Sequence, residues 1–240
     1  MDENIRVSVA MATYNGEKYI KEQIESILCQ LKGEDELVIS DDGSNDETIS
    51  IINEYMREDK RIKLLSGPRS GVKQNFANAI ENTKGKYIFL SDQDDVWMSN
   101  KIERVLKYFI KEDFSLIVHN AEIVNENLKK NLKSFFEYRK SGAGVIKNIY
   151  KNTYIGCCMA FDSKIKKDIL PIPDNIEMHD QWIGIINDKK YKKSFFLNEQ
   201  LIKYRRHENN VSQMKPYGWI RRIKNRMILI SELQKRWRKK

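Results

Sequence analysis

The chain is poor in cysteine and proline, and it has no long apolar run. Its 240 residues include three Cys and four Pro. No stretch approaches the roughly 18 consecutive apolar residues of a membrane-spanning helix, which argues against an integral membrane protein. The first residues also lack the basic and apolar segments of a signal peptide. We therefore expect a cytoplasmic protein with one large domain, or one domain and a small appendage.

The cysteines fit neither a disulfide framework nor a zinc site. Cys29 falls in a helical pattern, whereas Cys157 and Cys158 are neighbours in an apolar run. Their number is odd, adjacent cysteines rarely bridge, and the spacing matches no zinc motif. We expect all three to be buried, reduced thiols without a catalytic role.

The first 120 or so residues alternate short apolar runs with longer amphipathic ones. Strands are predicted at 7–12, 36–40, 62–65, 87–90 and 116–118, and helices at 20–31, 44–56, 71–82 and 102–109. This alternation is typical of an α/β protein whose mostly parallel sheet is covered on both faces. The capping-box spacing at 44–47 marks one helix start.

The second half is less regular. Residues 125–150 are rich in Lys and Asn and suggest a mobile insertion. Strands are predicted at 154–161, 195–197 and 201–204, and a helix at 179–186.

Three polar loops follow predicted strands, at 13–16, 41–44 and 92–95. In a parallel sheet the carboxyl ends of the strands meet at one edge, where α/β proteins bind their ligands. Chance would scatter such loops over both edges. Their convergence therefore predicts a binding site.

Three carboxylates, Asp92, Asp94 and Asp95, crowd the end of the apolar run 87–90. Carboxylates this close repel one another unless a cation lies among them. In an extended segment Asp92 and Asp94 would point to the same side and share one ion. The alternative is a solvated acidic turn that caps the next helix. We favour Mg²⁺ or Mn²⁺ holding a phosphate-bearing ligand.

The other two loops carry groups that suit a nucleotide. Asp41 or Asp42 could accept a hydrogen bond from a base N–H or a ribose hydroxyl, although the segment also suits a plain turn. Thr13 could bond the edge of a nucleobase beside Tyr14. Neither a P-loop nor a dinucleotide fingerprint is present, so we expect a metal to hold the phosphates.

Several later residues have both a structural and a chemical interpretation. Asp180 either caps a helix or serves as the general base for an acceptor hydroxyl. Arg205 and Arg206 either form a basic surface cluster or neutralise a diphosphate, with His207 as a metal ligand or phosphate donor. Lys73 either reaches the diphosphate or stays solvated.

Together these motifs resemble a known family. The segments 11–16, 41–44 and 92–95, followed by Asp180, are similar to the inverting family 2 glycosyltransferases with a GT-A fold. The strings 91–97 and 204–207 resemble the rhamnosyltransferase-type branch, and the likeness spans about residues 5–212.

The resemblance implies an α/β fold of GT-A type, with a Rossmann-like, mostly parallel sheet flanked by helices. A nucleotide-binding half, 1–120, would precede an acceptor half, 121–212, and a basic amphipathic helix, 213–240, would follow as a C-terminal extension.

The implied reaction transfers a sugar, with rhamnose suggested, from a dTDP- or UDP-sugar to a hydroxyl of a glycan or lipid-linked acceptor. It inverts the configuration of the anomeric carbon and serves cell-surface polysaccharide synthesis. Mn²⁺ or Mg²⁺ would assist. By position, Asp94 of the DXD motif, Asp92 and His207 would bind the metal, and Asp180 would be the base. The nucleotide would contact Thr13, Tyr14, Asn15, Asp41, Asp42, Lys73 and Asp92, and the diphosphate would contact Arg205 and Arg206. The chain departs from the family at His179, where Glu is common.

The net charge of +9 gathers at one end. Between Lys215 and Lys240 there are ten Lys or Arg and a single acid, Glu232, so this tail accounts for the whole excess. Its apolar residues recur at helical spacing. The tail therefore packs on the domain with a solvated basic face, or lies on anionic lipid at the inner face of the plasma membrane.

Two other classes of function stay open. A sugar-nucleotide nucleotidyltransferase would typically carry a glycine-rich, basic phosphate loop near its N-terminus, which 13–16 lacks. A non-catalytic basic protein that binds membrane or nucleic acid fits the net charge. Nucleic acid is disfavoured as a partner, because the basic residues gather at one terminus while the acids cluster at the predicted site.

Overall fold

A central sheet organises the molecule. The computed structural model describes residues 6–130, 134–208, 210 and 218–238. Within these residues the sheet has eight strands in the order β3-β2-β1-β4-β7-β6-β8-β5. Its first four strands are mutually parallel: β1 (Val7–Thr13), β2 (Glu36–Asp41), β3 (Ile62–Ser66) and β4 (Tyr87–Asp92).

The second half of the chain completes the same sheet. The parallel pair β6 (Leu116–Asn125) and β8 (Ser194–Arg206) is joined to β4 through the short antiparallel strand β7 (Met159–Asp162). A two-residue strand, β5 (Val96–Trp97), pairs antiparallel with β8 at the edge. The predicted α/β class with a mostly parallel sheet is confirmed.

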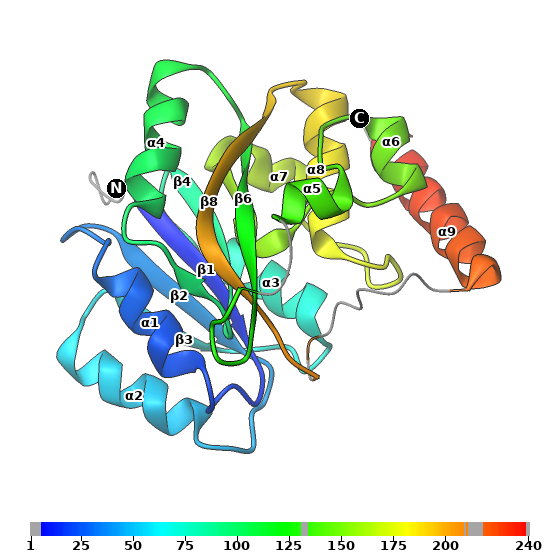
Figure 1. The fold of residues 1–240 in the computed structure, drawn as a ribbon. Helices are drawn as coiled ribbons and strands as arrows, with labels where there is room; N and C mark the ends of the chain where they lie inside the picture. Colours follow the sequence, from blue (N-terminus) through cyan, green and yellow to red (C-terminus); the bar gives the residue numbers. More distant parts are fainter. Residues whose placement is uncertain (1–5, 131–133, 209, 211–217, 239–240) are drawn as a thin grey trace.

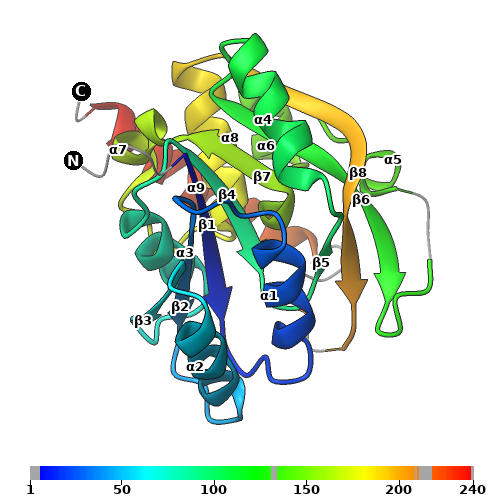
Figure 2. The same ribbon diagram turned by 90° about the vertical axis from the view of Figure 1, so that its left-hand side faces the viewer.

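Helices cover both faces of the sheet (Figures 1 and 2). One face carries α1 (Ile20–Leu28), α2 (Thr48–Glu58) and α4 (Lys101–Lys111), and the other carries α3 (Val72–Glu81), α7 (Lys166–Ile169) and α8 (His179–Lys190). The apolar stripes read from the sequence face inward. Their buried members include Ile20, Ile24, Ile27, Ile102, Val105 and Phe109.

Three predicted elements differ in detail. The strand expected at 154–161 begins only at Met159, because residues Gly156–Cys158 form a 3₁₀ turn, η1. The two strands expected at 195–197 and 201–204 are one continuous strand, β8. Helix α2 begins at Thr48 and not near Ser44, because the Ser44 hydroxyl donates to Asp41 Oδ2 at 2.6 Å and does not cap the helix.

Two further expectations need correction. In place of a mobile insertion over 125–150, the described residues form α5 (Phe135–Arg139) and α6 (Val145–Tyr150), and Phe135 is buried. Residues 131–133 of that region lie outside the described residues. Cys29 is exposed because it follows the last turn of α1, whereas Cys157 and Cys158 are buried, and all three are free thiols.

The C-terminal helix, α9 (Trp219–Arg238), lies beside α6 on the side of the molecule away from α1 and α2 (Figure 1). Residues 213–217 and 239–240 of the predicted extension fall outside the described residues. Among the helices that the structure describes, none has the length and apolar character needed to cross a bilayer.

Gly184 of α8 tests how tightly the second half is packed. A Cβ there would lie 2.2 Å from Cε2 of Tyr154, whose hydroxyl is tied to Asp188 Oδ2 at 2.6 Å. Overpacking of this kind costs about 1–3 kcal/mol, which exceeds the roughly 1 kcal/mol that Ala gains over Gly in a helix. We expect Gly184→Ala to lower the melting temperature by a few degrees in a thermal melt. Gly33→Ala, where nothing lies within 4 Å, should leave it unchanged or raise it.

Candidate active site

The strand register brings the three polar loops together. In the pairing of β1 with its neighbours, Thr13 lies opposite Asp41 and Ala12 lies opposite Asp92. The loops that follow these strands therefore leave from one edge of the sheet, as predicted. Thr13 Oγ1 donates to Asp41 Oδ2 at 2.8 Å, which joins the first loop to the second.

Asp41 and Asp42 shape the loops at this edge. Asp41 is buried and accepts hydrogen bonds from the Gly43 and Ser44 amides at 3.0 and 2.8 Å. Asp42 accepts from Gly71 N at 2.7 Å, which ties the second loop to the start of α3. Much of their hydrogen-bonding capacity is thus used within the protein.

Tyr14 and Asn15 lie at the exposed rim of this edge. Asn15 has a left-handed backbone, φ 48°, and its side chain accepts from Asn45 N at 2.9 Å. The Tyr14 ring is about half exposed and is free to stack against a flat ligand.

Two glutamines that sequence reasoning missed hold the loops in place. Gln93 accepts from Tyr14 N at 2.8 Å and donates to Tyr14 O at 2.9 Å, so it clasps the first loop. Gln23 is fully buried in α1 and donates to Ser91 Oγ at 2.7 Å and Asp92 O at 2.8 Å. Gln23 had a sequence signal, because it is a polar residue beside the inward-facing stripe of α1.

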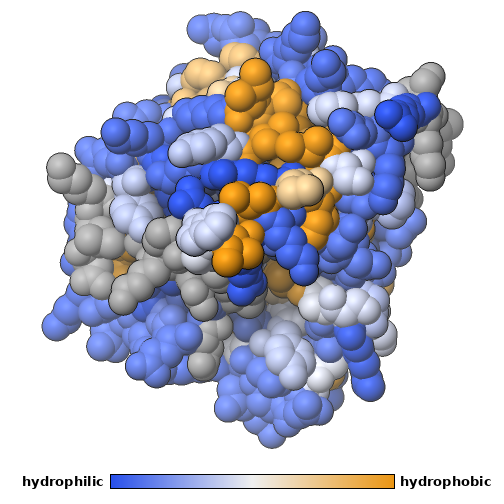
Figure 3. Space-filling view, turned by 90° about the vertical axis from the view of Figure 1, so that its right-hand side faces the viewer, coloured by the Kyte–Doolittle hydropathy of each residue, from blue (hydrophilic) through white to orange (hydrophobic). Residues whose placement is uncertain are grey.

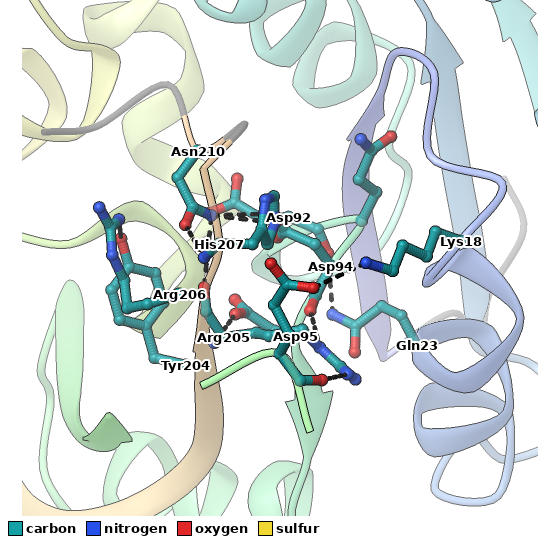
Figure 4. Close-up of polar contacts among 12 residues, drawn as sticks. Lys18, Gln23, Asp92, Asp94, Asp95, Tyr204, Arg205, Arg206, His207 and Asn210 are labelled. Atoms are coloured by element: carbon teal, nitrogen blue, oxygen red, sulfur yellow. Dashed lines mark hydrogen bonds and ion pairs between the residues drawn. The ribbon is translucent and has the colours of Figure 1, made fainter. Parts of the chain in front are cut away.

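The three acids of the metal loop, residues 92–95, divide into two groups. Ligand atoms of Asp92, Asp95 and Cys157 all lie within 4.8 Å of one another. Asp94 instead meets His207, whose Nε2 lies 2.8 Å from its Oδ2 (Figure 4). Strand β4 ends at Asp92, so strand geometry does not fix where Asp94 points.

The same carboxylates nevertheless share one electrostatic environment. Burial, together with the negative charges of Asp94 and Asp180, raises the pKa of Asp92 to about 7. Asp95 is fully buried, which raises its pKa well above the usual range, and its Oδ2 has no hydrogen-bond partner. Repulsion and an orphaned buried oxygen are what a cation would relieve.

Arg205 supports the metal loop from behind. It is buried, its backbone N donates to Asp95 Oδ1 at 2.9 Å, and its Nε donates to Asp94 O at 2.7 Å (Figure 4). Its guanidinium also pairs with Glu22 of α1. These contacts span more than 100 residues of sequence, so no local pattern could reveal them.

Arg206, His207 and Asn210 lie at the mouth of the site. Arg206 is half-buried beside Tyr204 and, with His207, lines an open hollow whose far wall is residues 125–127. Asn210 Nδ2 donates to Asp94 Oδ2 at 3.1 Å and was not anticipated from the sequence.

Lys73 points toward the second half of the chain. Its ammonium donates to Asp174 O and Ile176 O, both at 2.5 Å, so it ties α3 to the segment before α8. Burial lowers its pKa. Its predicted contact with a diphosphate stays a prediction.

Lys101 is a buried cation that the sequence analysis did not identify. Its Nζ lies 3.6 Å from the centre of the Trp97 ring and donates to Cys157 O at 2.9 Å. Burial lowers its pKa to about 8. A charged residue on the apolar stripe of α4 was the signal that the sequence offered. The hydrogen bond from Lys101 to Cys157 O fixes η1 next to the metal loop.

Asp180 lies in the first turn of α8, and its carboxylate is buried. Asn152 Nδ2 donates to its Oδ1 at 2.9 Å, and Gln181 N donates to the same oxygen at 2.6 Å. Burial raises the pKa of Asp180 to about 6, a value that suits a group which accepts a proton near neutral pH.

His179, the departure from the resemblance, is a packing residue. It is buried, its ring stacks on Phe76 at 4.2 Å, and neither ring nitrogen has a hydrogen-bond partner. Burial lowers its pKa to about 3, so the ring is neutral. A Cβ on Gly156 of η1 would lie 2.7 Å from His179 Nε2, so only glycine fits there without a shift.

The donor set fits a divalent cation. Carboxylate oxygens suit Mg²⁺ and Mn²⁺. The buried Asp95 Oδ2 without a partner and the close approach of Asp94 to His207 are the observations that support this fit. Burial raises the pKa of Cys157 well above its usual range, which makes its thiol a poor ligand.

The chain belongs to glycosyl transferase family 2, whose pattern it matches over residues 8–170. An uncharacterised glycosyltransferase of Methanocaldococcus jannaschii is 33% identical and aligns with 87% of this chain and 74% of its own length. The Escherichia coli enzyme WfgD, named as a UDP-Glc:α-D-GlcNAc-diphosphoundecaprenol β-1,3-glucosyltransferase, is 29% identical, with 87% and 80% covered. The Shigella flexneri dTDP-rhamnosyl transferase RfbG is also 29% identical, with 83% and 72% covered.

Solved structures share the fold. Residues 1–349 of S. aureus TarS, solved with UDP-GlcNAc, superpose with a TM-score of 0.71 at 19% identity; the match covers 94% of this chain and 66% of that one. Glucosyl-3-phosphoglycerate synthase of Mycobacterium tuberculosis, solved with Mn²⁺, UDP and glucosyl-3-phosphoglycerate, gives 0.61 at 14% identity, with 97% and 80% covered. The fold is therefore of GT-A type, and the chain is a glycosyltransferase.

The contact between Gly156 and His179 generates a prediction. A methyl group at Gly156 would displace His179, and Asp180 would move with it. Misplacement of a reacting group by about 1 Å can lower a rate by about 100-fold. We expect Gly156→Ala to reduce sugar transfer by about 10- to 100-fold while donor binding is retained, as measured by steady-state kinetics and calorimetry. Gly33→Ala is the matched control, and equal rates in the two variants would contradict this positioning.

Proposed function

We propose that this glycosyltransferase transfers a sugar from a dTDP- or UDP-sugar to an acceptor hydroxyl with inversion of the anomeric carbon. One observation carries the proposal. Turn η1 lies against both groups: a Cβ on Gly156 would lie 3.8 Å from Asp180 Cβ, and the ligand atoms of Cys157, Asp92 and Asp95 lie within 4.8 Å of one another. This proximity supports a base and a cation acting together at the edge where the loops of β1, β2 and β4 meet.

The nucleotide-binding half is residues 1–120 in this proposal. Tyr14 stacks on the base, and Thr13, Asn15, Asp41 and Asp42 form the rim that receives the base and ribose. Support comes from the hydrogen bonds that fix this rim, since a preorganised loop loses little entropy when ligand binds. Asp92 contacts the ribose or the metal.

Asp94, Asp92 and His207 would hold Mn²⁺ or Mg²⁺. When bound, such an ion neutralises the charge that develops on the departing diphosphate. Arg206 adds positive charge at the mouth of the site, where it lines the hollow with His207. Arg205, which is buried in contacts with the loop, acts by holding Asp94 and Asp95 in place.

Asp180 accepts the proton of the acceptor hydroxyl as its oxygen attacks the anomeric carbon. The bond from that carbon to the diphosphate oxygen breaks, and a nucleoside diphosphate leaves. Asn152 orients the carboxylate, since it donates to Oδ1. The acceptor half is residues 121–212, because α8 carries the base.

The acceptor is a glycan or a lipid-linked glycan of cell-surface polysaccharide synthesis, and the enzyme works at the inner face of the plasma membrane. The likeness to WfgD, whose name includes a diphosphoundecaprenol acceptor, supports this choice. The likeness to RfbG supports rhamnose as the sugar.

Donor binding should depend on the metal loop. In a thermal-shift screen of nucleotide sugars we expect one donor to stabilise the protein when Mn²⁺ or Mg²⁺ is present. Asp94→Asn should weaken that metal-dependent binding at least about tenfold, because it removes one charged ligand. Asp113→Asn, an exposed change at the opposite end of the sheet, is the control. A nucleotidyltransferase would instead release inorganic diphosphate when the products are analysed.

The assignment of the base gives a second test. Asp180→Asn should lower the transfer rate by about 10²- to 10⁴-fold and leave donor binding intact. In the wild type the rate should fall as the pH drops through about 6, because the protonated carboxyl cannot accept a proton. The kinetic pH profile measures this limb. Near-normal turnover of the variant would show that another group is the base.

A further inference from the structure

Helix α9 has two different faces, and one of them holds the helix on the domain. Leu229 and Leu233 are buried. Arg236 donates to the carbonyls of Leu170 at 2.6 Å and Asp168 at 3.0 Å. These contacts of the inner face attach α9 to the domain, so the attachment does not require the outer face.

The outer face is apolar and open to solvent. Five large apolar side chains on it are between 39% and 71% exposed: Trp219, Ile220, Ile223, Met227 and Ile230. Steps of three, four and seven residues place them on one side of the helix. A surface helix normally turns such a stripe inward, so this stripe points to a ligand outside the chain.

Helix α6 extends this surface. Ile146 is 86% exposed and Tyr150 is 66% exposed. The Arg226 guanidinium lies 4.4 Å from the centre of the Tyr150 ring and donates to Tyr150 O, which fixes α6 against α9. Figure 3 shows hydrophobic side chains gathered on this side of the molecule, with hydrophilic residues around them.

The charge on α9 is mostly positive. Over Trp219–Arg238 there are seven Lys or Arg and one acid, Glu232. Glu232 accepts from Asn175 at 3.0 Å and pairs with Lys235 at 2.7 Å, so its charge is compensated. A basic helix with an exposed apolar stripe is the pattern of helices that lie in the headgroup region of anionic bilayers.

We propose that the outer face of α9, together with Ile146 and Tyr150 of α6, docks on an anionic phospholipid bilayer. The apolar side chains enter the boundary between headgroups and acyl chains, while the basic residues contact lipid phosphates. A second copy of the chain fits less well, because a two-fold interface would bring two strongly basic faces together. The biological purpose, reaching a lipid-linked acceptor, rests on the proposed function, whereas the docking surface itself does not.

Vesicle flotation tests the surface with the full-length protein. The probes are vesicles of phosphatidylcholine alone and of phosphatidylcholine with phosphatidylglycerol. We expect binding to the anionic vesicles, and loss of that binding at high salt. The double variant Ile220→Gln with Met227→Gln should reduce binding at least about tenfold. Ile110→Gln, the same kind of change at a 61% exposed residue of α4, should leave it unchanged.

Two results would overturn the proposal. One is equal flotation of the wild type and the double variant on anionic vesicles. The other is a wild-type dimer in light scattering that the double variant loses, with no vesicle binding by either, since a second copy would then cover the face. Donor binding, measured by thermal shift in the same variants, separates this question from the proposed function. If no donor binds to any of these proteins, the result counts against the proposed function and leaves the flotation result unaffected.

Discussion

Mutual repulsion of carboxylates at the end of β4 is the constraint on which the site depends. Asp92, Asp94 and Asp95 lie within a segment of four residues, and Asp95 is fully buried. Residues from distant parts of the chain hold this loop in place despite the repulsion. Arg205 from β8 holds Asp94 and Asp95, and Gln23 from α1 holds the backbone of Asp92. The loop is thus preorganised at the cost of charge repulsion that a divalent cation would relieve.

This arrangement explains why the second half of the chain matters to the edge where the loops of β1, β2 and β4 meet. Strand β8 passes beside β6 and ends at Arg206, so it delivers Arg205 and His207 to the loop after β4. Turn η1 also reaches this loop. Its Cys157 approaches Asp92 and Asp95, while its Gly156 packs against His179. A short turn therefore links the proposed cation site to the residue that precedes the proposed base.

The sequence predicted the parts of this site that depend on local pattern and parallel topology. Apolar runs located β1, β2 and β4, and their shared direction placed Thr13, Asp41 and Asp92 at one edge, which the register confirms. The roles of Arg205 and Gln93 depend on contacts across about 80 to 110 residues, and no periodicity reports them. Strand β4 ends at Asp92, so strand geometry does not fix where Asp94 points, and the sharing of one ion by Asp92 and Asp94 stays a prediction.

The C-terminal helix shows how composition can support two interpretations that structure then separates. From the sequence, packing on the domain and contact with lipid were alternatives, because a helical wheel does not show which stripe finds a partner. In the fold, Leu229 and Leu233 take the packed stripe, and the stripe through Ile223 and Met227 stays exposed. Attachment through one face leaves the other fixed in orientation relative to the domain. A helix held in this way can dock without first being ordered, so less of its binding energy is lost to conformational entropy.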